Sequence, residues 1–290
     1  MLLHISALLY FLTLSRAMDS GIVGGKEAKP HSRPYMVSVQ HNGRHTCGGI
    51  LIRKDFVLTA AHCLKADLEV VLGAHNIKKT EPNQQRIQVR NSIRHPNYNK
   101  YTTAGNWENL TVDIMLLKLK SNAKLNKFVK VMKLPGKKDK TSVKCNIAGW
   151  GMRQPNSMES NVLIETSLTV LPQPECKEIW QIYYDSNCMM CTATAEDNTF
   201  CQVWQSGTWI HGAALTNKLI QIINQILYKS YLPLSLTQGD SGGPLICKSK
   251  LQGLAIYTFR ERCNDPRYPG VSLKISTFLD WIKKVMGKEI

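Results

Sequence analysis

From Ile22 onward the chain is a succession of short apolar segments separated by turn residues, with proline or glycine about every 8–15 residues. The stretch YMVSVQHNGRHTCGGILIRKDFVLTAAH predicts a strand, an Asn-Gly hairpin turn, a second strand, a break at Gly-Gly and a third strand. RIQVRNSIRH, IMLLKLK, SVKCNIAGW, VLIETSLTVL and PLICKSKLQGLAIYTF continue the pattern. The sequence therefore predicts an all-β protein of many antiparallel strands, a barrel or a sandwich.

The C-terminal stretch STFLDWIKKVMGKEI differs from the rest, because its apolar residues recur at helical spacing: Phe278, Trp281, Ile282 and Val285. It predicts a terminal α-helix packed on the body. The 290 residues are enough for one large β domain or two small ones with an ample core.

Nine cysteines are spread over most of the chain, which is typical of a secreted protein with disulfides. Because nine is odd, at least one has no partner within the chain. The apolar run Leu2–Leu14 is short for a membrane span, and the small residues Ser15 and Ala17 follow it. Residues 1–17 are therefore predicted to be a signal peptide rather than a retained anchor, and the protein to be extracellular, with no membrane span.

The net charge is +16, from 37 basic and 21 acidic residues. In a secreted protein such a balance indicates polyanions, such as sulfated glycosaminoglycans, or cell surfaces, and not nucleic acid. A solvated basic surface with no specific partner is the alternative, and the charge alone does not decide between them.

Three separated motifs carry nucleophilic chemistry: LTAAHC contains His62, VDIMLLKL contains Asp113, and GDSGGP contains Ser241. A serine hydroxyl is a weak nucleophile and needs a base, which an imidazole provides near neutral pH. A buried carboxylate fixes the tautomer of that imidazole and stabilises its charged form. Glycines beside the serine let main-chain amides face the oxyanion that forms on attack.

In the order His, Asp, Ser these motifs resemble the chymotrypsin-like serine proteases, and the start IVGGKEAKPHSRPYMVSVQ resembles the granzyme and mast-cell protease branch, whose members are stored in secretory granules. The resemblance implies two six-stranded antiparallel β-barrels with the active site between them, over residues 22–290. It implies an endopeptidase that hydrolyses polypeptides through an acyl-enzyme and needs no metal or cofactor. It also implies that serine protease inhibitors bind the protein.

The resemblance also assigns roles around the motifs. Gly239 and Ser241 would supply the oxyanion amides, and a new N-terminus at Ile22 would pair with buried Asp240 on activation. Gly21 precedes Ile22, so a trypsin-like activator would not cut there. The propeptide 18–21, MDSG, is two dipeptides, which fits removal by a dipeptidyl peptidase as in granzymes.

Four disulfides follow from the same resemblance: Cys47–Cys63, Cys145–Cys247, Cys176–Cys191 and Cys201–Cys263. Cys188 is left as a free thiol, an intermolecular link or a competitor of Cys191 for Cys176. Asn109, in the sequence NLT, is a candidate N-glycosylation site.

The predicted specificity pocket departs from the family. Thr199 stands where trypsin-like members carry aspartate, so cleavage after Lys or Arg is not expected, and Phe200 fills space. The opposite wall is Ile256-Tyr257-Thr258, in place of serine, aromatic and glycine. Gly270 keeps one wall open. Together these residues predict a small or reshaped apolar pocket.

The second departure is an insertion. Deleting the 36 residues from Val203 to Gln238 restores the contiguous TFCQGDSGGPLIC of the family. The insertion begins with valine, whose codons start with GT, as an intron does. It ends with YLPLSLT, which pyrimidine-rich codons encode, and with glutamine, whose codon can be CAG, and an intron ends in a pyrimidine tract and AG. An unspliced intron read in frame is therefore favoured. A genuine loop is the alternative, since Leu215, Leu219, Ile222, Ile223 and Ile226 fit one helical face.

The leading hypothesis is therefore a secreted granzyme-like serine endopeptidase, with the inserted form impaired because Gly239 is no longer held one residue from Cys201. The alternative is a catalytically impaired cationic binding protein on the same fold, favoured by the insertion, Ile256 and the charge.

Overall fold

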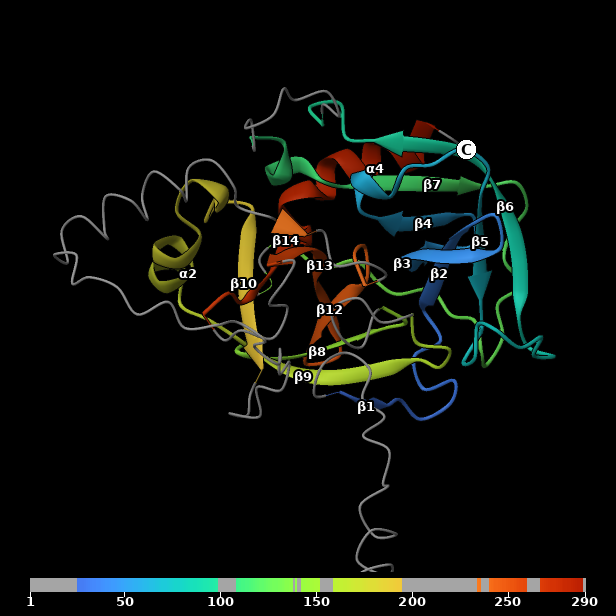
Figure 1. Cartoon of the computed structure of the whole chain (residues 1–290). Coiled ribbons are helices and arrows are strands. Elements are labelled where there is room, and N and C mark those ends of the chain that lie inside the picture. The colour runs from blue at the N-terminus through green and yellow to red at the C-terminus, as the bar shows by residue number, and fades with distance from the viewer. Residues whose placement is uncertain are drawn as a thin grey trace, which may run out of the picture.

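The computed structural model describes residues 25–98, 108–137, 139, 142–151, 159–194, 234–235, 240–259 and 267–288. The first half of the chain forms a closed six-stranded antiparallel barrel (Figure 1) in the order β2-β3-β4-β7-β6-β5. Its strands are β2 (Met36–His41), β3 (Arg44–Arg53), β4 (Phe56–Thr59), β5 (Leu68–Leu72), β6 (Gln85–Arg94) and β7 (Met115–Leu119).

The second half forms another six-stranded barrel, in the order β9-β10-β14-β13-β12-β8, which a pairing between β8 and β9 closes. Its strands are β8 (Lys144–Gly149), β9 (Ile164–Val170), β10 (Met189–Thr194), β12 (Pro244–Cys247), β13 (Lys250–Phe259) and β14 (Gly270–Lys274). Two short strands attach to it: β1 (Lys26–Glu27) pairs with β9, and β11 (Leu234–Ser235) pairs with β13. The predicted fold class, two six-stranded antiparallel barrels, is confirmed.

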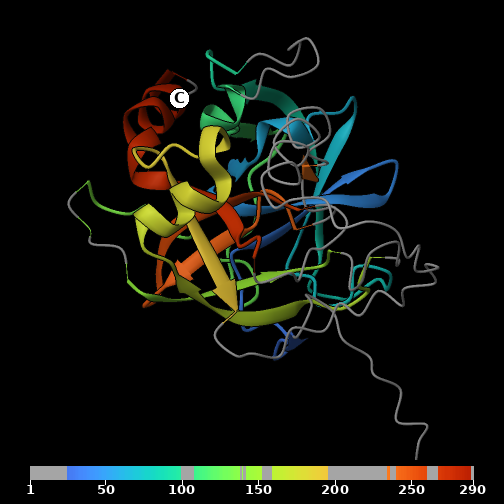
Figure 2. The same ribbon diagram turned by 60° about the vertical axis from the view of Figure 1, so that its left-hand side comes forward.

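The predicted C-terminal helix is confirmed as α4 (Leu279–Lys288), which follows a 3-10 turn, η4 (Ile275–Phe278). It lies outside both barrels (Figure 2) and docks on the first one. Arg53 Nη1 donates a 2.9 Å hydrogen bond to the Met286 carbonyl, and the His95 ring packs 5.2 Å from Trp281. A second helix, α2 (Gln173–Trp180), precedes β10. Among the residues described, no helix is long and apolar enough to cross a bilayer.

The turn prediction at Asn42-Gly43 is confirmed, since β2 ends before it, β3 begins after it, and both residues have positive φ. The predicted break at Gly48-Gly49 is wrong, because β3 runs through both glycines. The two glycines allow neighbouring segments to pack closely against β3, and they do not form a turn. A Cβ on Gly49 would meet the Val57 side chain, and one on Gly48 would lie 3.0 Å from the backbone of Gly243.

The two barrels share a buried cluster centred on Trp150, which is fully buried at the end of β8. Met36 and Val71 of the first barrel and Leu163 of the second pack in the same cluster. Trp150 Nε1 donates a 3.0 Å hydrogen bond to the His75 carbonyl, so the indole also satisfies its one polar group. Trp150 thus fixes one barrel against the other.

We predict that Trp150→Ala lowers the free energy of unfolding by about 3–5 kcal/mol, because it leaves a large cavity at the junction of the barrels. Ile182→Ala, at a side chain that is 82% exposed, is the matched control and should change stability little. Denaturant unfolding of the uncleaved chain measures both. Similar losses for the two variants would contradict a junction held by Trp150.

Candidate active site

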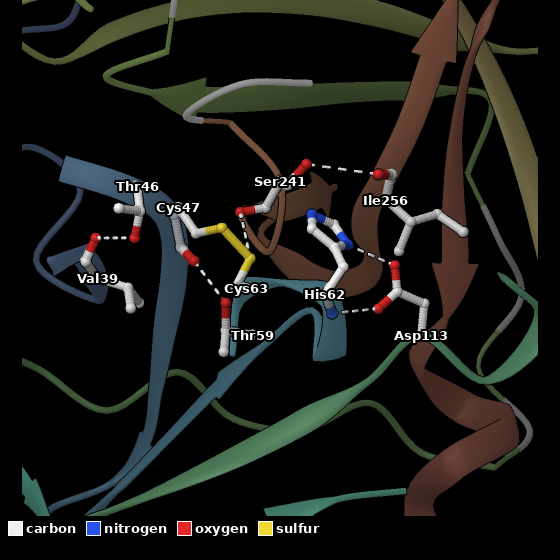
Figure 3. Close-up of a disulfide and its surroundings, with 10 residues drawn as sticks. Val39, Thr46, Cys47, Thr59, His62, Cys63, Asp113, Ser241 and Ile256 are labelled. Atoms are coloured by element: carbon white, nitrogen blue, oxygen red, sulfur yellow. Dashed lines mark hydrogen bonds and ion pairs between the residues drawn. A yellow bond between two sulfur atoms is a disulfide. The ribbon is translucent and has the colours of Figure 1, made fainter. Parts of the chain in front are cut away.

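His62 lies in a 3-10 turn, η1 (Ala61–Cys63), directly after β4. The disulfide Cys47–Cys63 ties this turn to β3, with the two Cα atoms 6.2 Å apart (Figure 3). Thr59 Oγ1, at the end of β4, donates a 2.8 Å hydrogen bond to the Gly48 carbonyl, which holds the same two segments together. The imidazole therefore projects from a turn that is fixed covalently and by a buried hydrogen bond.

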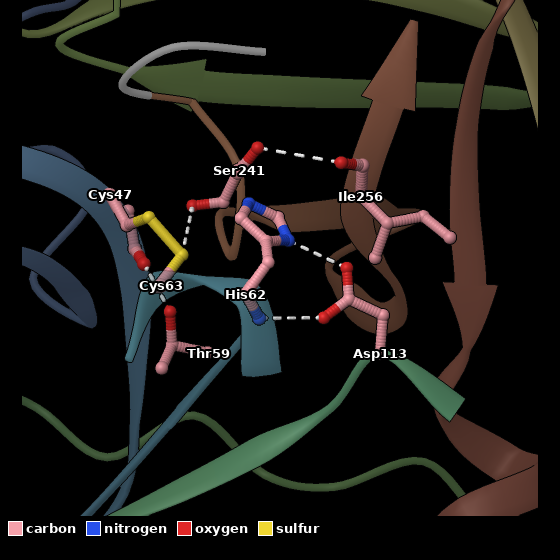
Figure 4. A network of polar contacts seen from close by, with 8 residues as sticks. Cys47, Thr59, His62, Cys63, Asp113, Ser241 and Ile256 are labelled. Atoms are coloured by element: carbon pink, nitrogen blue, oxygen red, sulfur yellow. Dashed lines mark hydrogen bonds and ion pairs between the residues drawn. A yellow bond between two sulfur atoms is a disulfide. The ribbon is translucent and has the colours of Figure 1, made fainter. Parts of the chain in front are cut away.

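Asp113 precedes β7, follows the 3-10 turn η2 (Glu108–Val112), and is completely buried. Its two oxygens hold His62: Oδ2 pairs with the ring Nδ1 at 2.6 Å, and Oδ1 accepts a 2.9 Å bond from the His62 main-chain N–H. A buried carboxylate needs such partners. The double contact orients the imidazole so that its other nitrogen lies on the side of Ser241 (Figure 4).

Tyr98 was not singled out in the sequence, although it belongs to this site. It is partly buried, and burial together with the nearby Asp113 charge raises the pKa of its phenol. Its place between β6 and the Asp113 segment is set by tertiary contact, for which no local sequence signal exists.

Ser241 lies in a tight turn before β12 and is 1% exposed. Its carbonyl accepts a 2.9 Å bond from Gly48 N–H of the first barrel, and its Oγ donates a long 3.4 Å bond to the Ile256 carbonyl. Gly242 has φ +80°, and a methyl group there would overlap Thr59 and the Gly48 carbonyl. Glycine is thus needed at position 242 to bring the serine against the other barrel.

The carboxylate of Asp240, the residue before the serine, is enclosed between two glycines of the second barrel. Its Oδ1 accepts a 2.9 Å bond from Gly151 N–H, and a methyl group on Gly149 or Gly151 would overlap the carboxylate. Burial raises the pKa of Asp240 to about 6, an effect that the Gly151 bond opposes. The two glycines, which the sequence reading missed, form a site that is shaped for this carboxyl.

The wall Ile256-Tyr257-Thr258 is buried at the end of β13. Tyr257 does not offer its hydroxyl to a substrate, because it donates a 2.6 Å bond to the Tyr183 carbonyl and its ring packs 5.1 Å from Trp180. Thr258 Oγ1 donates a 3.5 Å bond to the Tyr268 carbonyl, so its side chain spans toward the segment that leads to Gly270.

The structure contains three of the four disulfides that the resemblance implied, Cys47–Cys63, Cys145–Cys247 and Cys176–Cys191. Cys188 is a buried free thiol whose pKa is raised to about 12, by burial and by the nearby Asp185, so it stays protonated. Outside the described residues lie Ile22, Thr199, Phe200, Gly239 and Cys201–Cys263, and the side chain of Asn109 is not described.

The cluster of Cys47, Cys63 and His62 does not form a metal site. Cys47 and Cys63 bring their sulfur atoms within 4.8 Å of a His62 ring nitrogen. Both sulfurs belong to a disulfide and offer no thiolate, which is the form that binds a metal. In the part of the chain that is described, this is the one such cluster.

Comparison with known proteins identifies the family to which this two-barrel chain belongs. A family model described as Trypsin matches residues 22–208 and 213–282, and the chain belongs to this family. Granzyme B of Homo sapiens is 38% identical over 97% of both chains. Cathepsin G of Mus musculus is 36% identical over 97% of this chain and 91% of its own.

The fold is also that of a solved serine protease. A structure described as neuropsin, a serine protease expressed in the limbic system of mouse brain, superposes with a TM-score of 0.72 at 31% identity. It covers 91% of this chain and all of its own.

We predict that the stability of the uncleaved chain depends on pH through Asp240. Its folded pKa of about 6 lies above the ordinary 3.8, so the stabilising contribution of the protonated carboxyl is complete below 3.8 and is lost as the pH rises through 6. The side chain of Asp240→Asn does not ionise. The free energy of unfolding of this variant should therefore rise relative to that of the parent between about pH 4 and pH 7, by up to about 3 kcal/mol.

Denaturant unfolding at the two pH values measures this gain. Asp67→Asn, at an exposed carboxyl, is the control and should follow the parent at both. An Asp240→Asn variant that also follows the parent would show that Asp240 keeps an ordinary pKa in the fold.

Proposed function

We propose that the protein is a granzyme-like serine endopeptidase in which Ser241 attacks the peptide carbonyl, His62 takes and returns the proton, and Asp113 orients the imidazole. The observation that carries this proposal is the double contact of Asp113 with the ring Nδ1 and the main-chain N–H of His62. It leaves the other ring nitrogen on the side of Ser241, whose proton the imidazole would take as general base. Family membership supports the same chemistry.

The reaction follows from these positions. Attack by Ser241 Oγ forms a tetrahedral intermediate, the amine leaves with the proton held by His62, and water then hydrolyses the acyl-enzyme. The oxyanion would be bound by the main-chain amides of Ser241 and Gly239. No step in this mechanism uses a metal or a cofactor.

Activation at Ile22 belongs to the same proposal. Asp240 is a buried carboxyl without a cationic partner among the contacts described, and a new ammonium group would give it one. The family match begins at residue 22, where processing of the signal peptide 1–17 and the propeptide 18–21 would end. Secretion and storage in granules are proposed by analogy with the granzyme and mast cell protease relatives.

A cationic binding protein on the same fold is the second candidate. The net charge of +16 favours it, with sulfated glycosaminoglycans as the partner class. The insertion of residues 203–238 favours it too, because an oxyanion donor that is misplaced costs about 10²–10³-fold in rate. In that case the form without residues 203–238 would be the enzyme.

We predict that a fluorophosphonate labels Ser241 in the form that lacks residues 203–238 and begins at Ile22. Asp113→Asn in this form should reduce peptide turnover by about 10⁴-fold, the loss known for the corresponding change in this class of protease. Ser241→Ala should abolish labelling and is the control. Absence of labelling in the parent form, with the fold intact by circular dichroism, would favour the binding protein.

We also predict that Thr258→Gly widens substrate choice. The Thr258 side chain bonds toward the Tyr268 carbonyl, so its removal opens the predicted pocket to larger apolar residues. In a peptide library, kcat/KM for substrates cleaved after Phe or Tyr should rise relative to those cleaved after Ala or Val. Thr258→Ser, which keeps the hydroxyl, is the matched control, and an equal shift in both variants would show that the hydroxyl is not what restricts the pocket.

A further inference from the structure

The inserted segment contributes one described element, β11, and its place is informative. β11 pairs antiparallel with the end of β13, with Leu234 opposite Phe259 and Ser235 opposite Thr258. These two residues of β13 lie beyond the strand pairs of the barrel. The pairing with β12 ends at Leu254, and the pairing with β14 ends at Tyr257.

The paired residues lie close to the nucleophile along the strand. Ala255 exchanges hydrogen bonds with Gly242 and Gly243, and the next carbonyl, that of Ile256, accepts the Ser241 hydroxyl. Thr258 is two residues further, about 7 Å along an extended strand. The end of β13 is therefore a sheet edge that leads directly away from Ser241.

The edge that β11 covers is the one on the side of the serine. On the other side of β13, Val271 stands opposite Tyr257, and the Tyr268 carbonyl accepts the Thr258 hydroxyl. The segment from Tyr268 to Val271 thus occupies that side. β11 therefore pairs with the other edge of β13, on the same side as β12 and Ser241.

A polypeptide substrate needs the same edge. A sheet edge offers unpaired N–H and C=O groups to which an extended peptide adds as a further strand. A substrate whose carbonyl reaches Ser241 Oγ extends its preceding residues along Ile256 to Phe259, because this edge starts at the serine. β11 already provides an antiparallel strand there.

We propose that β11 is an intramolecular competitor of the substrate, which makes the 290-residue form autoinhibited at the end of β13. The inference rests on the proposed protease function. Four residues, 236–239, join β11 to Asp240, so Ser235 stays within about 18 Å of it. A strand tethered this closely competes at an effective concentration on the order of millimolar.

Competition has a kinetic signature that differs from damage to the oxyanion site. A tethered competitor raises KM for peptides that reach Thr258 and leaves kcat unchanged, whereas a lost oxyanion donor lowers kcat for every substrate. A short acyl ester, which ends before Thr258, should escape the competition. A fluorophosphonate should escape it too.

The test uses the 290-residue form processed to Ile22 and the double variant Leu234→Pro/Ser235→Pro, which removes both N–H donors of β11. Leu234→Ala/Ser235→Ala is the matched control, since it keeps both donors. We expect the proline variant to lower KM for a four-residue peptide thioester by about tenfold, or about 1.4 kcal/mol. KM for a single-residue thioester, and the rate of fluorophosphonate labelling, should not change.

Amide hydrogen exchange on β13 tests the pairing without activity. Because N–H groups alternate between the two sides of a strand, only one of Thr258 and Phe259 directs its N–H toward β11, and the proline variant should lose protection at that residue. Unchanged protection, or an unchanged KM for the peptide in an enzyme that labels normally, would overturn the inference. An equal gain in the alanine variant would overturn the main-chain pairing. If the form lacking residues 203–238 is not labelled at all, the protease function fails, and hydrogen exchange still reports on β11.

Discussion

The turn from Asp240 to Gly243 is held between the two barrels by main-chain hydrogen bonds, and the spacing of the candidate catalytic residues depends on it. Gly48 N–H of the first barrel binds the Ser241 carbonyl, while Gly242 and Gly243 bond to Ala255 of the second. His62 and Asp113 belong to the first barrel, so the serine meets them only where the barrels touch. The glycines on both sides of this contact, together with Trp150, set how closely the barrels approach.

Much of this could be predicted from the sequence, because the signals are local. Alternating apolar segments, Asn42-Gly43 and the helical spacing of Phe278 to Val285 each determine the structure of their own segment. What failed was the break at Gly48-Gly49. A glycine pair has the same sequence signature whether it forms a turn or makes room for a neighbouring main chain. Only the close approach of Gly243 shows that this pair makes room for a neighbouring main chain.

The site was predicted in part for a similar reason. His62, Asp113 and Ser241 carry motifs, and the structure brings them together. Tyr98 and the glycines that enclose Asp240 carry none, because their contribution lies in which remote segment they contact. The bond from the Tyr257 hydroxyl to the Tyr183 carbonyl likewise joins remote segments, and no local signal predicts it.

The insertion acts on this site through two separate physical effects. It removes the short connection that would hold Gly239 near Cys201, and it adds a strand beside Thr258 and Phe259. In the proposed mechanism, the first effect would change how well the oxyanion is bound, and the second would change how well a peptide docks. If the proposed protease function holds, a chain with only the second effect would keep His62, Asp113 and Ser241 in place and would resume peptide cleavage when β11 is displaced. With β11 paired to β13, the Ser241 carbonyl still accepts the Gly48 N–H and its hydroxyl still donates to the Ile256 carbonyl, so the serine keeps its place between the barrels, as a blocked site requires.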